Sequence, residues 1–194
     1  MAAFFNDAYK GTPPWDIGRP QPEFVRLAGE GLIRGKVLDV GCGTGEHAIL
    51  FAGTGLTALG IDAAPLAIQK AKRKASERGS SATFIVGDAL KLGKLKEKFD
   101  TITDSGLFHV FSDQEREVFA KSLGSAINEG GTYFMLCFSD KEPEGWGGPR
   151  RVSKAEIRAT FGEGWRINWI REAGFATMFH DDGGRAWLSS IART

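Results

Sequence analysis

Three aspartates and one glycine-rich segment are the residues best suited to hold a ligand. Asp39, Asp62 and Asp88 stand at or near the ends of the short apolar runs KVLDVG, TALGID and ATFIVGD. In VLDVGCGTGE (37–46), glycines fall at 41, 43 and 45, between a run typical of a strand and one typical of a helix. Ligands of open parallel sheets bind beyond the carboxyl ends of the strands. There Asp62 could bind ribose hydroxyls and Asp88 an amino group such as adenine N6, so these residues outline a site for an adenosine.

The loop spacing G-x-G-x-G departs from the dinucleotide fingerprint G-x-G-x-x-G, because Glu46 stands where the third glycine belongs. Asp39 and Glu46 also place two carboxylates around the helix N-terminus, and these oppose a pyrophosphate there. S-adenosylmethionine carries a sulfonium and an ammonium but no phosphate, so we predict it as the cofactor, with S-adenosylhomocysteine as the product. The alternatives are a nucleotide-dependent oxidoreductase, a non-catalytic cofactor-binding module, or a tight turn with Asp62 and Asp88 as helix caps.

His109 follows the apolar run at 99–105, on the side of the sheet where an acceptor is expected to bind. A thiolate or halide acceptor needs no strong base, whereas a phenol or a protonated thiol would benefit from one. We therefore predict His109 as the catalytic residue, with a histidine packed among the neighbouring phenylalanines as the alternative. Trp146, in the Gly- and Pro-rich segment 141–151, is a candidate contact of the acceptor, with surface packing as its alternative.

No metal site is predicted. The chain has no C-x-x-C or H-E-x-x-H spacing. Asp104 and Asp140 are only nominal ligands, which capping or solvation explains better. Cys42 and Cys137 do not make a disulfide framework, and we interpret both as small packed residues.

Short apolar runs alternate with amphipathic stretches, the pattern of parallel strands connected by helices. Strands are predicted at 36–41, 57–62, 82–88, 99–105 and 132–139, and helices at 46–52, 65–79 and 112–128. The segments 165–178 and 185–193 predict a closing strand pair, with turn residues at 181–184. We expect an α/β fold: a Rossmann-like, doubly wound, mostly parallel seven-stranded sheet with one antiparallel strand near the edge.

Two S-x-x-E sequences, Ser112 to Glu115 and Ser153 to Glu156, predict capping boxes at the starts of two helices. The first helix is expected to bury one face, composed of Val118, Phe119, Leu123, Ala126 and Ile127. In the helix at 65–79, the basic run KAKRK is expected to form a solvated face, with the alanines turned toward the sheet.

The 194 residues carry 25 Lys and Arg against 24 Asp and Glu, a formal net charge of +1. This balance argues against a nucleic acid as partner, and no apolar run approaches the roughly 18 residues that predict a membrane span. The N-terminus lacks a signal-peptide pattern, so we expect a cytoplasmic protein. Length predicts one domain over 1–194. It would comprise a covering arm or lid (1–35), a cofactor-binding core (36–140), and an acceptor-side loop with closing strands (141–194).

The motifs VLDVGCGTGE, ALGID, FIVGDAL and FDTITDSGLFH resemble those of class I S-adenosylmethionine-dependent methyltransferases, over about residues 36–140. PPWDIGRPQPEF (13–24) is similar to a segment of the thiopurine and halide/thiol methyltransferase group. DSGLFHVF (104–111) resembles bacterial relatives that methylate small thiols, phenols or heterocyclic toxins. The resemblance implies an N-terminal arm that covers the cofactor, a contact from Trp15, and a cofactor-lining Ser105.

The family resemblance, the glycine loop and the strand ends together predict the cofactor-binding residues Trp15, Asp39, Gly41, Cys42, Gly43, Asp62, Ala63, Asp88, Ala89 and Ser105. The chain leaves little sequence for a lid, so we predict a small-molecule acceptor. The sequence leaves open whether sulfur, oxygen or nitrogen is methylated, and leaves the oligomeric state open.

Overall fold

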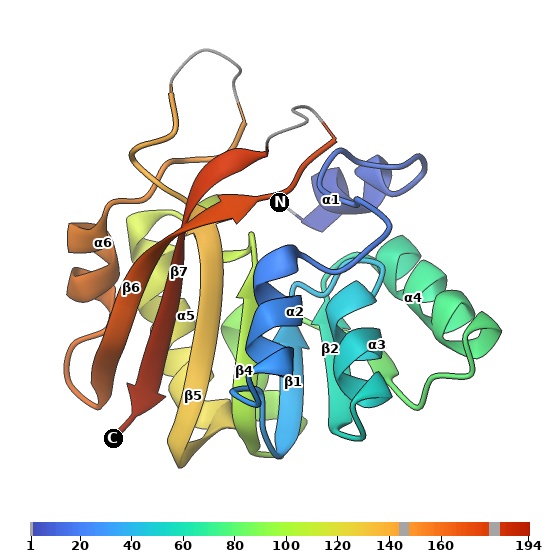
Figure 1. Cartoon of the computed structure of the whole chain (residues 1–194), viewed down its shortest axis with the longest axis horizontal. Helices are drawn as coiled ribbons and strands as arrows, with labels where there is room; N and C mark the ends of the chain where they lie inside the picture. The colour runs from blue at the N-terminus through green and yellow to red at the C-terminus, as the bar shows by residue number, and fades with distance from the viewer. Residues whose placement is uncertain (1, 144–147, 179–182) are drawn as a thin grey trace.

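The predicted strands join in one sheet in a computed structural model that describes residues 2–143, 148–178 and 183–194. The strands are β1 (Lys36–Val40), β2 (Thr57–Asp62), β3 (Thr83–Val86), β4 (Phe99–Ser105), β5 (Ile127–Phe138), β6 (Trp165–Phe175) and β7 (Gly184–Arg193). Their order in the sheet is β3-β2-β1-β4-β5-β7-β6, with β1 to β5 parallel and β7 antiparallel to both of its neighbours (Figure 1). The expectation of seven strands with one antiparallel strand near the edge is confirmed.

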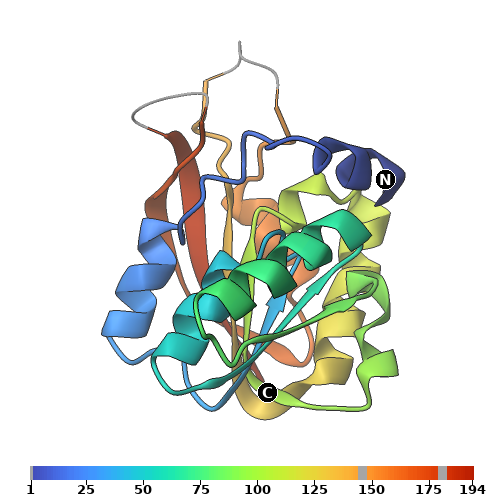
Figure 2. The same cartoon turned by 90° about the vertical axis from the view of Figure 1, so that its right-hand side faces the viewer.

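Helices cover both faces of this sheet (Figure 2). The α-helices are α1 (Ala2–Ala8), α2 (Pro22–Gly29), α3 (Glu46–Gly53), α4 (Pro65–Glu77), α5 (Asp113–Ala126) and α6 (Lys154–Thr160), and the 3-10 helices are η1 (Ala89–Leu95) and η2 (Phe108–Val110). Residues of α2, α3 and α4 share one buried cluster with one face of the sheet, and residues of η1, α5 and α6 share the other. The helix α1 lies across the end at which the parallel strands terminate.

Some element boundaries predicted from the local apolar pattern differ from those in the structure. β5 begins at Ile127, five residues before the predicted start, and runs through Gly130 and Gly131. A Cβ atom at Gly131 would lie only 2.8 Å from the carbonyl oxygen of Asn128, so this strand needs glycine where glycine usually signals a turn. The helices α1 and η1 were not predicted at all, because neither has a long enough periodic pattern.

The buried face of α5 differs from the predicted one at Val118, which is 48% exposed. Phe119 is fully buried and packs against Phe111 and Tyr133, with ring centroids 5.0 and 6.1 Å apart. Arg116 is also buried, and its guanidinium lies 4.6 Å from the Phe108 ring centroid. The buried face of α5 therefore includes Arg116, with Phe119, Ala120 and Leu123, and leaves Val118 outside it.

Both predicted capping boxes are present, at Ser112 and Ser153. The carboxylate of Glu156 does more than cap α6. It accepts hydrogen bonds from Ser153, from Arg116 on α5 (3.1 Å), and from Arg150 in the segment after β5. This network fastens α6 and the segment at 148–153 to α5, beside the carboxyl ends of the parallel strands.

Both cysteines are free and buried, as expected for packed residues. None of the helices within the described residues is long and apolar enough to cross a membrane.

Replacing Phe119 with alanine should lower the free energy of unfolding by about 3–5 kcal/mol, because it leaves a cavity between α5 and the sheet. The adjacent Val118→Ala variant is the matched control and should change it by less than about 0.5 kcal/mol. Urea unfolding of both variants measures the difference. Equal losses would show that Val118 is packed as the periodicity predicted.

Candidate active site

The glycine loop joins β1 to α3 by a turn that other residues could not form. Gly45 precedes α3 with φ of +86°, and a Cβ there would lie 2.6 Å from the ring of Phe84. At Gly43, a Cβ would lie 2.7 Å from the hydroxyl oxygen of Tyr9, which belongs to the N-terminal arm. The second and third glycines of the loop thus allow close packing against β3 and the arm.

Asp62 ends β2 and holds the loop. Its two carboxylate oxygens accept hydrogen bonds from the backbone N–H groups of Gly43 (2.9 Å) and Ala64 (2.8 Å). Burial raises the pKa of Asp62, and these two N–H groups oppose the rise. The bond to Ala64 matches the helix-capping alternative, while each oxygen keeps a second lone pair for a hydroxyl group.

Asp39 is buried near the end of β1. Its Oδ1 accepts a hydrogen bond from the Thr103 hydroxyl at 2.8 Å, whereas its buried Oδ2 has no hydrogen-bond partner among the described residues. Burial raises the pKa of Asp39 to about 7, against the lowering effect of the Thr103 bond. A buried carboxylate oxygen without a donor is costly, and a cationic group brought beside it would stabilise the ionised form.

His47, in the first turn of α3, lies beside Asp39 with its Nδ1 3.9 Å from Oδ2. Its Nε2 accepts a hydrogen bond from the backbone N–H of Gln21 at 3.0 Å, so the neutral ring carries its proton on Nδ1. Burial lowers the pKa of His47 to about 4. The Gln21 side chain exchanges two 2.8 Å hydrogen bonds with the backbone of Ala176, just after β6. One residue of the arm therefore contacts both α3 and the end of β6.

The other predicted cofactor residues lie at the same edge of the sheet. Because β3, β2, β1 and β4 are neighbours in that order, Asp62, Asp39 and Ser105 approach one another, with Asp88 just beyond the end of β3. Asp88 is exposed and accepts a hydrogen bond from the N–H of Leu90, so it caps η1. The remaining predicted members of this set lie on the loop or directly after a strand: Gly41, Cys42, Ala63 and Ala89.

Glu46 does not have the predicted electrostatic role. Its carboxylate is buried and pairs with Lys74 (2.6 Å) and Arg78 (2.8 Å) of the α4 region. The charge is therefore neutralised locally, and Asp39 alone carries the argument against a phosphate. The basic run KAKRK was expected to form a solvated face. This is wrong for its last residue, Lys74, which pairs with the buried Glu46.

The N-terminal arm packs over the glycine loop. The Trp15 side chain donates from Nε1 to the Tyr9 hydroxyl at 3.0 Å, and its ring meets that of Phe5 edge-on at 5.7 Å. Asp16 accepts a hydrogen bond from Thr44 in the loop at 2.8 Å. Trp15 stays 36% exposed, so part of its ring is available to a ligand.

His109, in η2, is buried against the Phe138 and Phe175 rings. Its Nδ1 accepts a hydrogen bond from the backbone N–H of Phe138 at 3.1 Å. A backbone N–H can only donate, so the proton of the neutral ring sits on Nε2. No described residue bonds to that Nε2. Burial and the nearby arginines 116 and 151 lower the pKa of His109 to about 3. In this arrangement the Nε2–H of His109 is available to donate a hydrogen bond.

Asp104 shapes the turn that carries His109. Its carboxylate accepts hydrogen bonds from the N–H groups of Leu107 (2.7 Å) and Phe108 (3.0 Å) and from the Tyr133 hydroxyl (2.8 Å). Burial raises its pKa to about 7, and these donors oppose the rise. Asp140 accepts a bond from the Trp187 indole instead. Within the described ranges no cluster of His, Cys, Asp and Glu could hold a metal ion.

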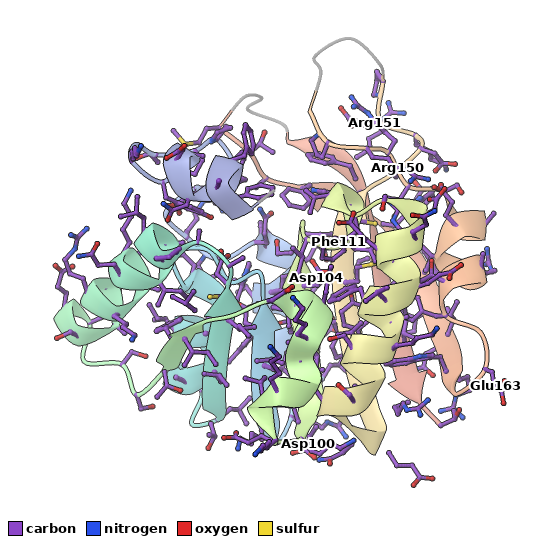
Figure 3. All side chains as sticks on the ribbon, turned by 180° about the vertical axis from the view of Figure 1, so that it is seen from behind. Asp100, Asp104, Phe111, Arg150, Arg151 and Glu163 are labelled. Atoms are coloured by element: carbon purple, nitrogen blue, oxygen red, sulfur yellow. The ribbon has the colours of Figure 1, made fainter. Side chains whose placement is uncertain are left out.

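A cavity of about 640 Å³ opens beside His109, between α1 and the start of α5. Its lining includes Phe4, Phe5, Val110, Phe111, Pro149 and Arg150. Figure 3 shows Phe111 and Arg150 at this end of the molecule, with Asp100 at the opposite end. Trp146, the predicted acceptor contact, lies outside the described residues. A second cavity, of about 530 Å³, lies at the opposite end and contains none of the predicted residues.

Sequence reasoning missed the contacts that fasten the arm. Tyr9, Gln21 and Asn6 join it to the glycine loop, to α3 and β6, and to the start of α4. Each of these bonds joins residues far apart in the chain, and no local periodicity or spacing reports them. The only signal was indirect: an arm rich in aromatic side chains needs a surface to pack against.

A family model described as a methyltransferase domain matches residues 37–131. A 2-heptyl-1-hydroxyquinolin-4(1H)-one methyltransferase of Mycobacteroides abscessus is 39% identical over 179 residues, 87% of this chain and 79% of the relative. A probable thiol methyltransferase 2 of Arabidopsis thaliana is 30% identical over 148 residues, 75% of this chain and 65% of the relative. A solved structure, reported under "Conversion of a Disulfide Bond into a Thioacetal Group during Echinomycin Biosynthesis", is 37% identical with a TM-score of 0.89. The alignment covers 100% of this chain and 93% of the chain in that structure.

The buried neutral state of His47 should make stability fall on acidification. Its pKa is about 4 in the folded chain against 6.5 for a free histidine, so below pH 6.5 the unfolded chain binds the extra proton. Between pH 6.5 and 4 this group should remove about 3 kcal/mol of unfolding free energy. Urea unfolding across this range should show a shallower loss for His47→Gln, whose amide oxygen can still accept from Gln21. Parallel pH curves for the two proteins would contradict the assignment.

Proposed function

The chain belongs to the class I S-adenosylmethionine-dependent methyltransferases, and from this premise we propose that it methylates an ionised sulfur or oxygen atom of a small aromatic acceptor. The enzyme class and the cofactor follow from membership of the family. The proposal concerns the acceptor and the residues that act on it. The observation that carries it is the unpartnered Nε2–H of His109 at the edge of an apolar cavity.

The residues at the sheet edge fit the predicted cofactor. We propose that Asp39 stabilises its ammonium group, because the buried Oδ2 of that carboxylate otherwise lacks a donor. Asp62 would bind the ribose hydroxyls with lone pairs that its two backbone bonds leave free. Asp88 and Ala89, exposed or half-buried beyond β3, would contact the adenine.

The other proposed cofactor residues would leave room for the cofactor or cover it. Gly41, Cys42 and Gly43 let the backbone approach closely, Ser105 ends the neighbouring strand β4, and Ala63 is exposed beside Asp62. Trp15 would cover the site with the exposed part of its ring. When bound, S-adenosylmethionine supplies a methyl group activated by its sulfonium and leaves as S-adenosylhomocysteine.

His109 would hold the acceptor and favour its anion. A donor fixed at Nε2 stabilises a thiolate or phenolate relative to its protonated form, and so lowers the acceptor's pKa. The bond from the Phe138 N–H keeps the ring in this tautomer and orientation. The surrounding phenylalanines exclude water, which strengthens the hydrogen bond. The chain's own contribution is therefore to position the nucleophile rather than to remove its proton.

The relatives support this class of acceptor. One is named for a hydroxyquinolone, whose oxygen sits on a heteroaromatic ring, and another for a thiol. The solved structure with 37% identity concerns the conversion of a disulfide, which is also sulfur chemistry. These names speak against the nucleotide-dependent oxidoreductase considered from the sequence.

An acceptor screen that measures release of S-adenosylhomocysteine tests the proposal. Thiophenols, phenols, N-hydroxy heteroaromatics, aliphatic thiols, iodide and aromatic amines should be compared at one pH. The proposal expects the first three classes to be methylated fastest. Cofactor binding without turnover of any compound would favour the non-catalytic module instead.

Asp62→Ala should weaken binding of S-adenosylmethionine by more than about tenfold, because a charge-assisted hydrogen bond to the ribose is lost. Isothermal titration calorimetry measures the affinity. Asp62→Asn serves as a control for loop structure, because its amide oxygen can keep one of the two backbone bonds. Unchanged affinity in the alanine variant would remove Asp62 from the cofactor site.

For His109, the pH profile separates a donor from a base. If His109 donates, the rise of kcat/KM with pH should follow the acidity of each acceptor across a series of ring-substituted thiophenols. His109→Ala should lower kcat/KM about tenfold to a hundredfold and shift each rise to higher pH, because the anion loses its donor. A rise at one fixed pH for all acceptors, abolished in the variant, would instead identify His109 as the base.

A further inference from the structure

The cavity between α1 and η2 extends the proposed acceptor site beyond His109. On one side it is lined by Phe4 and Phe5, and on the other by Val110, Phe111 and Pro149. Its volume of about 640 Å³ lies within the range of pockets that hold small organic ligands.

Apart from His109, whose Nε2–H stays available to the acceptor, the polar residues of this lining already have partners. Ser112 and Glu115 bond to each other in the capping box of α5. The Arg150 guanidinium pairs with Asp113 at 2.6 Å and with Glu156. No free charge therefore faces a polar substituent, and what the lining offers a ligand is apolar surface.

Phe4 is 68% exposed and contacts a neighbouring aromatic ring of its own helix. Its ring meets that of Phe5 edge-on at 5.4 Å, and Phe5 packs in turn on Trp15. Asn6, in the same helix, accepts a hydrogen bond from the N–H of Leu66 at 3.0 Å, where α4 has no side-chain cap of its own. The helix α1 is thus anchored on the cofactor side, and its phenylalanines line the acceptor side.

We infer that this cavity binds an unbranched alkyl substituent of the acceptor, carried on the ring whose heteroatom lies at His109. The acceptor is then amphiphilic, with a polar reacting end and an apolar tail against Phe4, Phe5 and Phe111. This inference rests on the proposed function. It is supported by the apolar lining, the already paired Ser112, Glu115 and Arg150, and the exposed Phe4 ring.

Two series of compounds test the inference: para-alkyl thiophenols and para-alkyl phenols, each from methyl to pentyl. In the unaltered enzyme kcat/KM should rise about threefold per methylene until the cavity is filled, because each methylene leaves water. Phe4→Ala should lower the ratio of pentyl to methyl compound about tenfold, and Phe4→Leu should restore most of it. Val118→Ala, an exposed change on α5, is the control and should keep the full ratio.

Binding measured without turnover separates this inference from the proposed function. Titration of the same compounds into the protein with S-adenosylhomocysteine should give the same increase in affinity along each series. Such an increase without methyl transfer would support the tail site and contradict the proposed acceptor chemistry. Equal affinity and equal kcat/KM from methyl to pentyl would overturn the tail site. So would a Phe4→Ala variant that keeps the full pentyl-to-methyl ratio but changes the association state in sedimentation, because the face would then join two copies.

Discussion

A carboxylate buried near the end of β1 is the constraint on which the rest of the site depends. Asp39 cannot be solvated, so its charge requires partners within the fold. Thr103 satisfies one oxygen, and the other faces the Nδ1 of His47 without a hydrogen bond. That orientation requires a donor for Nε2, which the Gln21 backbone supplies. The buried carboxylate, the His47 tautomer and the backbone of the N-terminal arm are thus linked through adjacent contacts.

The sequence was sufficient for those features that local patterns encode. Alternating apolar runs and amphipathic stretches predicted the strands, their parallel arrangement and the antiparallel closing strand. Serine and glutamate at the right spacing predicted two capping boxes, because that motif is complete within four residues. The positions of Asp39 and Asp62 followed from strand ends, since the topology brings these ends together.

What the sequence could not predict depends on contacts between distant segments. Val118 was assigned to the apolar stripe of α5 but is exposed, whereas Arg116 is buried, with its guanidinium against Phe108 and Glu156. Glu46 looked like a charge aimed at the ligand, but Lys74 and Arg78 neutralise it from α4. His109 was placed correctly after β4, whereas its role depends on a backbone N–H from β5. A histidine's protonation state belongs to its surroundings, and one sequence does not describe them.

The hydrogen bonds between Gln21 and Ala176 restrict the order in which contacts can form while the protein is synthesised. The arm contributes no strand to the sheet. Gln21 and Ala176, which form these hydrogen bonds, are 155 positions apart in the chain. During synthesis the arm leaves the ribosome well before its partner beside β6. Long loop closures form late in folding. The contact between Gln21 and the end of β6 therefore forms only after most of the sheet has been synthesised, whereas the arm's aromatic contacts with α3 and α4 need only the first part of the chain.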